Sequence, residues 1–114
     1  LLAGIPLTDK ILSRSFAVIT AHEPDQLDWN ALARMDTLII LMGGRNLGII
    51  IEQLIAEGKD AGCPIAIIRK AGTDQQQVWI GTLENIVELT QGNKLSPTVM
   101  VIGEVVKLRA DFYK

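Results

Sequence analysis

Short apolar runs alternate along the chain with segments whose apolar residues recur at helical spacing, and this pattern predicts an α/β fold. Five runs rich in β-branched residues are typical of buried strands, at 16–20, 37–41, 65–68, 78–80 and 98–102. Helices are expected to begin after Asp28, Asn46 and Thr82, because the side-chain oxygens of these residues accept hydrogen bonds from the free N–H groups of a first helical turn. Gly58 is expected to end the second helix.

The order of these elements predicts a mixed five-stranded sheet flanked by helices. Helical crossovers favour parallel strand neighbours, whereas the short connection from Arg69 to Gln77 permits an antiparallel hairpin. The segment after Gly103 is expected to add a short strand or helix. The 114 residues contain no repeat or linker, so we expect a single compact domain.

Composition and charge exclude some classes of binding partner. Eleven basic and 13 acidic residues give a net charge of −2, which argues against a general nucleic-acid binder. No apolar run approaches the roughly 20 residues that span a bilayer, so we expect no membrane partner. Cys63 is the single cysteine, which excludes an intramolecular disulfide, suits the cytoplasm and predicts that Cys63 packs as a small apolar group. No His, Asp or Glu spacing indicates a metal site, and none is predicted.

The beginning of the chain suggests a piece of a longer protein. It opens on Leu1 without Met, and it lacks the basic start and long apolar centre of a signal peptide. The mean hydropathy of +0.28 is high for a small soluble domain. We therefore expect an apolar face that is normally covered.

The turn from Leu41 to Asn46 is the strongest candidate for chemistry. It joins an expected strand to an expected helix and contains Gly43 and Gly44, and ligands in α/β sheets gather beyond the carboxyl ends of strands. It lacks the P-loop and GxGxxG patterns, and a tight turn without a ligand is equally compatible with it. Ala71–Thr73 also follows a strand, although an ordinary surface loop is the commoner interpretation. If the two strands are parallel neighbours, both loops flank one pocket.

Several cations lie near expected strand ends, where a polyanion would meet them: Arg14, His22, Arg45, Arg69 and Lys70. Solvated surface charges are the commoner explanation. His22 is the only histidine, and a hydrogen bond in a turn is favoured over acid–base work. No arrangement of residues indicates a nucleophilic triad.

A resemblance to a known family joins these features. In order, the chain contains the segments GIPLTDK, SRSFAVITAHE, LDWNALARMDTLIILMGGRNL, CPIAIIRKAGTDQQQVWIGTLENI and PTVMVIGEVVKLR. Their order and approximate spacing resemble the carboxyl-terminal half of the uroporphyrinogen-III C-methyltransferases, which are tetrapyrrole methylases. The resemblance covers nearly the whole chain, from Ala3 to Arg109.

The resemblance implies an S-adenosylmethionine-dependent enzyme that methylates two ring carbons of uroporphyrinogen III and makes precorrin-2 for sirohaem and cobalamin. It releases S-adenosylhomocysteine. Such enzymes are homodimers with the active site between two α/β domains, and the second domain is a mixed five-stranded sheet. Residues 1–15 would then enter from a missing first domain, residues 16–114 would form the second domain, and the piece alone would be inactive.

The resemblance also implies roles for individual residues. By position, the residues that would hold the methyl donor are Met42, Gly43, Ala71 and Gly72. The residues that would contact the tetrapyrrole are Thr8, Arg14, Thr20 and His22. Two departures from the family affect these roles: Ala21 stands where relatives have Gly, and the loop from Gly72 to Gly81 is one residue shorter than in many relatives. No catalytic residue is assigned, and the proton acceptor is expected from the substrate, water or the missing half.

Two other interpretations stay open at this point. The first is another tetrapyrrole methylase, acting on a later precorrin. The second is a non-catalytic α/β module for ligand binding or dimerisation.

Overall fold

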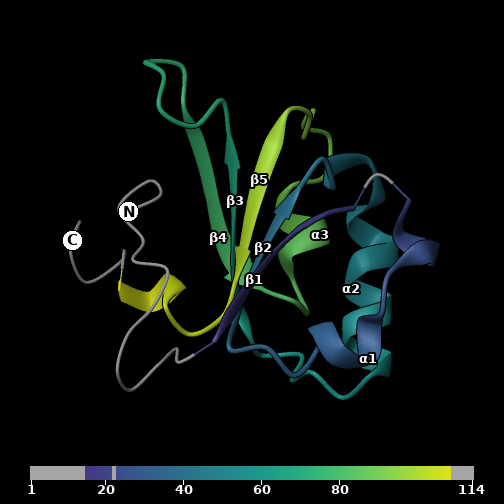
Figure 1. Ribbon diagram of the computed structural model, residues 1–114. Helices are drawn as coiled ribbons and strands as arrows, with labels where there is room; N and C mark the ends of the chain where they lie inside the picture. The colour runs from purple at the N-terminus through teal and green to yellow at the C-terminus, as the bar shows by residue number, and fades with distance from the viewer. Residues whose placement is uncertain (1–14, 22, 109–114) are drawn as a thin grey trace.

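The chain folds into one sheet with helices, and the computed structural model describes residues 15–21 and 23–108 (Figure 1). The strands are β1 (Phe16–Thr20), β2 (Thr37–Leu41), β3 (Pro64–Arg69), β4 (Gln77–Thr82) and β5 (Thr98–Ile102). The α-helices are α1 (Trp29–Leu32), α2 (Leu47–Ala56) and α3 (Ile86–Leu89), and the 3-10 turns are η1 (Pro24–Gln26) and η2 (Gly44–Asn46). All five expected strands are confirmed within a residue or two at each end.

The sheet is mixed, as expected, with the strand order β1-β2-β5-β3-β4. β1 and β2 are parallel, and the pairs β2–β5, β5–β3 and β3–β4 are antiparallel. The carboxyl ends of β1, β2 and β3 therefore lie at one edge, together with the amino ends of β4 and β5. We call this the upper edge, as it appears in Figure 1, and the opposite one the lower edge.

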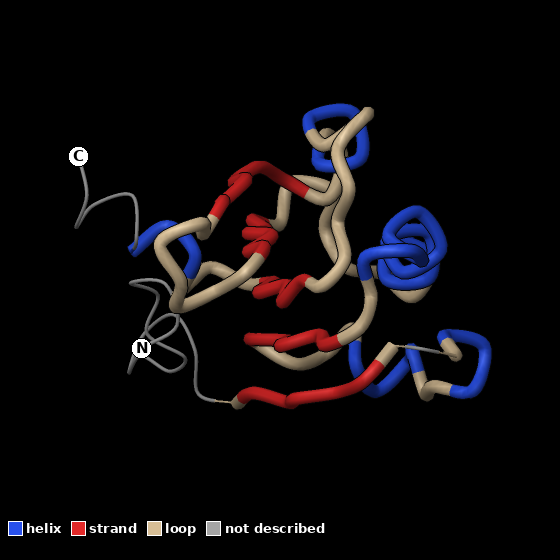
Figure 2. The backbone as a smooth tube through the Cα atoms, turned by 90° about the horizontal axis from the view of Figure 1, so that it is seen from above, coloured by secondary structure: helices blue, strands red, loops and turns tan. Residues whose placement is uncertain are grey.

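The three α-helices cover one face of the sheet (Figure 2). Large aliphatic side chains fill this layer, with Ile50 and Leu54 of α2 fully buried against Ile40, Ile65 and Met100 of the strands. The other face carries a smaller core, in which Val105 and Val106 of the helical turn after β5 pack on Ile39, Ala66, Ile68 and Val101. No helix in the described ranges is long and apolar enough to cross a membrane.

Two of the three expected helix starts are confirmed, because α1 begins directly after Asp28 and α2 directly after Asn46, but only Asp28 makes the expected capping hydrogen bond. Asp28 caps α1 as expected, because its Oδ1 accepts a hydrogen bond from the Ala31 N–H at 3.2 Å. Thr82 is not the cap of α3, and this prediction is wrong: Thr82 stays in β4, and its N–H donates to Asn85 Oδ1 at 2.8 Å. That hydrogen bond delays the helix until Ile86.

Asn46 occupies the N-cap position of α2, but its side chain makes no capping hydrogen bond. Its amide nitrogen instead donates to the Ala21 carbonyl at 3.2 Å, which ties the end of β1 to the start of α2. Gly58 follows the end of α2 with φ of 100°, as the sequence predicts for a residue that stops a helix.

Candidate functional site

The two candidate loops lie at the upper edge, but the strands before them are not neighbours. β2 and β3 point the same way, and β5 lies between them and pairs with both, so that Val99 opposes Leu41 and Thr98 opposes Arg69. The two strands thus run parallel and end at the same edge without being neighbours. The start of β5 takes the central place between the loops, since its antiparallel direction brings its first residues to this edge.

Both loops open with a non-glycine residue in the left-handed region. Met42, directly after β2, has φ of 59°, and Lys70, directly after β3, has φ of 54°. Within the described ranges no other non-glycine residue has a positive φ. This conformation costs roughly 1–2 kcal/mol for an L-residue and clusters at sites where the surroundings enforce it. Met42 is 62% exposed, so packing in the core does not explain why a methionine occupies this left-handed position.

Gly43 and Gly44 shape the turn after Met42 by allowing close contacts. A Cβ on Gly43 would lie 2.9 Å from side-chain carbons of Ile40 and Ile50, so the residue faces the core. A Cβ on Gly44 would overlap the backbone carbonyl of Leu95. The turn is consequently fixed against the segment that leads into β5.

Two hollows open on either side of the start of β5. The first has a volume of about 360 Å³ and is lined by Met42, Gly44, Arg45, Ser96, Pro97 and Thr98. The second has about 260 Å³ and is lined by Ile68, Lys70, Ala71, Pro97, Thr98 and Val99. Because they share Pro97 and Thr98, a ligand that spans this strand end would meet both candidate loops.

Thr98 is the residue that the two hollows share and that sequence reasoning missed. Its side chain is 7% exposed, and its Oγ1 has no hydrogen-bond partner. Arg69 Nε, on the paired position of β3, is the one other buried side-chain N or O atom left unpartnered in the part of the chain that the structure describes. An unsatisfied buried polar group costs about 1–3 kcal/mol, so such atoms mark places where a ligand or water fits. The sequence shows Thr98 only as the first residue of a strand, because its position depends on which strands β5 pairs with.

The loop after β3 is held by its own hydrogen bonds. The Gly72 N–H donates to Gln76 Oε1 at 3.0 Å, and Thr73 Oγ1 donates to the Lys70 carbonyl at 2.8 Å. Gly72 has φ of 81°, which favours glycine. Ala71 lines the second hollow, whereas Gly72 lies outside the lining of both.

The end of β1 borders the same edge. Thr20 is exposed and pairs with Leu41, and the buried Ala21 donates its N–H to the Leu41 carbonyl at 2.9 Å. Ala21 does not take a positive φ, so this backbone does not require the glycine that relatives have there. The other expected substrate residues, Thr8, Arg14 and His22, lie outside the described residues.

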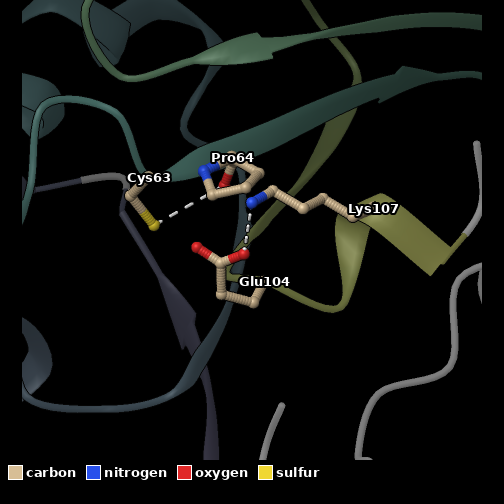
Figure 3. Close-up of polar contacts among 4 residues, drawn as sticks. All are labelled: Cys63, Pro64, Glu104 and Lys107. Atoms are coloured by element: carbon tan, nitrogen blue, oxygen red, sulfur yellow. Dashed lines mark hydrogen bonds and ion pairs between the residues drawn. The ribbon is translucent and has the colours of Figure 1, made fainter.

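A larger hollow lies elsewhere, at the lower edge, with a volume of about 460 Å³. Two of the charged groups here are used within the protein. Lys59 Nζ donates to the carbonyls of Ala33 at 3.3 Å and Met35 at 3.0 Å. Glu104 pairs with Lys107 at 2.8 Å (Figure 3). The described residues contain no group of three His, Cys, Asp or Glu side chains that could hold a metal. Size alone therefore does not identify the site.

Cys63 borders the lower hollow and packs against the main core, as expected for a small apolar group. Its Sγ donates to the Pro64 carbonyl at 3.7 Å (Figure 3). Burial raises the pKa of the Cys63 thiol, and the nearby Lys59 ammonium lowers that pKa by a smaller amount. A raised pKa makes a thiol a poor nucleophile at neutral pH, which argues for a structural role.

Comparisons with known proteins point to one family. The family model described as tetrapyrrole (corrin/porphyrin) methylases matches residues 1–87. The chain is 52% identical over 109 residues to a uroporphyrinogen-III C-methyltransferase of Synechococcus elongatus, and this match covers 96% of the chain and 45% of the relative. It is 42% identical to a siroheme synthase of Pseudomonas aeruginosa, of which it covers 24%. The chain thus spans less than half the length of these relatives.

Solved structures agree with the sequence matches. The chain superposes with a TM-score of 0.82 on the uroporphyrin-III C-methyl transferase of Thermus thermophilus complexed with S-adenyl homocysteine, at 28% identity and over 93% of the chain and 49% of that structure. A cobalt precorrin-4 methyltransferase gives a TM-score of 0.80 at 15% identity, which shows a shared fold.

Proposed function

This chain belongs to the tetrapyrrole methylases, and from that premise we propose that it is the carboxyl-terminal half of a uroporphyrinogen-III C-methyltransferase. The complete enzyme would use S-adenosylmethionine to methylate two ring carbons of uroporphyrinogen III, giving precorrin-2. The chain spans 45% of the Synechococcus elongatus relative, so the rest of the enzyme, including a first α/β domain, would be supplied by sequence outside these 114 residues.

The observation that carries this proposal is the strand end shared by the two hollows. Met42 and Ala71 approach it from loops on opposite sides, and the unpartnered hydroxyl of Thr98 lies between them. This hydroxyl suits a ligand with polar groups, as the methyl donor has. We infer that Met42, Gly43, Ala71 and Gly72 form this half of the donor site, with Gly43 and Gly72 setting the course of the two loops.

S-adenosylmethionine, when bound, supplies a methyl group on a sulfonium leaving group. The protein then needs chiefly to align that carbon with the ring carbon and to exclude water, since neither a covalent intermediate nor a metal is required. Among the described residues, the lining of these two hollows contains no carboxylate and no imidazole. We therefore propose that the proton acceptor belongs to the substrate, water or the rest of the enzyme.

The tetrapyrrole would lie on the side of β1. Thr20 is exposed there next to the β2 end, and we propose that it meets the substrate together with Thr8, Arg14 and His22. Phe16 and Val18 of the same strand are also exposed, on the face opposite the helices. Exposed apolar side chains support a partner on this face, and we propose the first domain or the second subunit of a homodimer. With a lone cysteine, we propose that the enzyme works in the cytoplasm.

Two preparations test the proposal: the 114-residue chain, and the full-length gene product to which it belongs. Each is incubated anaerobically with uroporphyrinogen III and S-adenosylmethionine, and the products are analysed by mass spectrometry. We expect two added methyl groups with the full-length protein and none with the chain alone, which should nevertheless give a cooperative unfolding transition.

The alternatives give different results in the same assay. A protein that binds S-adenosylhomocysteine but methylates only a later precorrin would replace the substrate assignment. A full-length protein that binds no S-adenosylhomocysteine would be a non-catalytic module and would overturn the proposal.

A further inference from the structure

A third hollow adjoins the first one on the side of α2. It has a volume of about 260 Å³ and is lined by Gly44, Arg45, Asn93, Lys94, Leu95 and Ser96. Gly44, Arg45 and Ser96 also line the first hollow, so the two are continuous at the upper edge. The third hollow is thus placed for a ligand that extends beyond the donor site.

The charges of this hollow have one sign. Of the described residues, Arg45 and Lys94 are the two charged ones in its lining, and none in its lining is acidic. In the described ranges neither side chain takes part in an ion pair or hydrogen bond. Lys59 and Lys107 at the lower edge, by contrast, are held by backbone carbonyls and by Glu104. Two adjacent cations without partners repel each other, and an anion relieves this repulsion.

A backbone contact holds together the two segments that carry these cations. Gly44 packs directly against the Leu95 carbonyl, so Arg45 and Lys94 stand on segments that touch. Asn93 Nδ2 donates to the carbonyls of Thr90 at 3.3 Å and Gln91 at 3.4 Å, which braces the loop that carries Lys94. The amide of Asn93 is therefore occupied, and the two cations are left to meet a ligand.

We propose that Arg45 and Lys94 bind a side-chain carboxylate of the tetrapyrrole. This inference rests on the proposed function, since uroporphyrinogen III carries eight carboxylates around a ring that extends well beyond the reacting carbon. A guanidinium presents a planar fork that matches a carboxylate, and an adjacent ammonium adds a second charge-assisted hydrogen bond. The pair is a substrate-binding element and takes no part in methyl transfer.

The test uses the full-length protein and two ligands. Uroporphyrin III, the oxidised and fluorescent octacarboxylate, serves as the probe for the tetrapyrrole, and S-adenosylhomocysteine serves as the probe for the donor site. We expect the double variant Arg45→Gln, Lys94→Gln to bind uroporphyrin III about tenfold more weakly at low salt. In the single variant Lys94→Gln, the Kd for S-adenosylhomocysteine, measured by calorimetry, should stay within about twofold, because Lys94 lines only the third hollow and neither of those assigned to the donor.

A matched control removes the same two charges at the lower edge. Arg34→Gln with Lys107→Gln changes the net charge identically, on exposed residues that border the lower hollow or its ion pair. This variant should bind uroporphyrin III like the wild type. Equal weakening by both double variants would mean that overall charge attracts the porphyrin, and this would overturn the proposal.

The remaining outcomes separate this inference from the proposed function. Unchanged uroporphyrin III binding in the Arg45, Lys94 variant, or weaker S-adenosylhomocysteine binding in Lys94→Gln, would overturn the carboxylate role while the donor site stands. Wild-type protein that binds neither ligand would overturn the proposed function, and this inference with it.

Discussion

The upper and lower edges of the sheet differ in how their polar groups and turns are used. At the lower edge the hollow is larger, yet Lys59 and Lys107 have partners. At the upper edge the hollows are smaller, but Thr98 Oγ1 and Arg69 Nε are unpartnered. Unsatisfied groups are costly, so their concentration at one edge identifies the binding side better than volume does.

The turns differ in the same way. The lower edge uses glycines for its positive φ angles, at Gly58 and Gly103, where glycine incurs no Cβ strain. The upper edge places Met42 and Lys70 in the left-handed region, where each costs stability. We propose that the Met42 side chain is kept at such a position by what it contacts when a ligand is bound. On this proposal the lower edge serves stability and the upper edge serves binding.

The largest changes in ligand affinity and stability should come from adding a Cβ at the two glycines that lie closest to another backbone segment, Gly44 and Gly103. Gly44→Ala places a Cβ onto the Leu95 carbonyl, which pushes the first candidate loop away from the start of β5. We expect the full-length protein to bind S-adenosylhomocysteine at least roughly 100-fold more weakly by calorimetry, because misplaced site geometry is costly.

Gly103→Ala is the counterpart at the lower edge. Its Cβ would overlap the Asp36 carbonyl, at a φ of 147° that L-residues rarely adopt. We expect the free energy of unfolding of the chain, from urea titration, to fall by about 2–4 kcal/mol. The affinity of the folded protein for S-adenosylhomocysteine should not change. If both variants lost ligand binding equally, the functional division between the edges would be wrong.

A smaller and cleaner contrast comes from two buried threonines. Thr98→Val removes the unpartnered hydroxyl at nearly constant shape, so we expect the free energy of unfolding to stay equal or rise by up to about 1 kcal/mol. We expect S-adenosylhomocysteine to bind about tenfold more weakly, since one ligand hydrogen bond is lost.

Thr90→Val is the matched control, because Thr90 is as buried as Thr98 but its Oγ1 donates to the Ile86 carbonyl at 2.9 Å. This variant should lose about 1 kcal/mol of stability and leave ligand affinity unchanged. A Thr98 variant that behaves like the Thr90 variant would remove Thr98 from the site.

The sequence predicted the elements well because periodicity records which side chains are buried. It placed all five strands, the β3–β4 hairpin and the capping by Asp28. It failed for two expected caps: the Thr82 backbone N–H donates to Asn85 Oδ1 within β4, and the Asn46 side chain donates to the Ala21 carbonyl instead of capping α2. Local propensity does not show which of these partners is close in space.

The candidate site was predicted only in part, for a topological reason. Met42 and Ala71 were found because each lies just beyond a strand, near a glycine. Thr98 begins a strand, and nothing local sets it apart from Thr37, which also begins one. It enters the site because β5 inserts antiparallel between β2 and β3, and strand order is a long-range property that one sequence does not display.

Replacing Met42 by glycine tests whether the strained turn at the upper edge serves binding, in contrast to the glycine turn at Gly58 of the lower edge. Met42→Gly removes roughly 1–2 kcal/mol of left-handed strain, but it also raises the entropy of the unfolded chain by a comparable amount. We therefore expect the free energy of unfolding to change by less than about 1 kcal/mol, with several-fold weaker binding of S-adenosylhomocysteine. Gly58→Ala, at a φ of 100° with open space around it, should cost about 1 kcal/mol and leave binding unaltered.

The smallest expected effect concerns the Cys63 thiol at the lower edge. Because burial raises its pKa, less thiolate is present in the folded chain than in the unfolded chain at about pH 8. Alkylation by iodoacetamide, followed by mass spectrometry, should be several-fold slower in native buffer than in urea. Saturating S-adenosylhomocysteine should not change the native rate, since Cys63 lies at the opposite edge of the sheet from Thr98.

The raised pKa of Cys63 also determines whether stability rises or falls with pH. A thiol whose pKa is raised on folding contributes stability that is fully present below the pKa of the unfolded thiol and is lost as pH rises through the folded value. Urea titrations of the wild type should therefore show a decline above about pH 8.5 that is shallower in Cys63→Ala. Protection of Cys63 by S-adenosylhomocysteine, or identical declines in the two proteins, would contradict the assignment of this edge to structure alone.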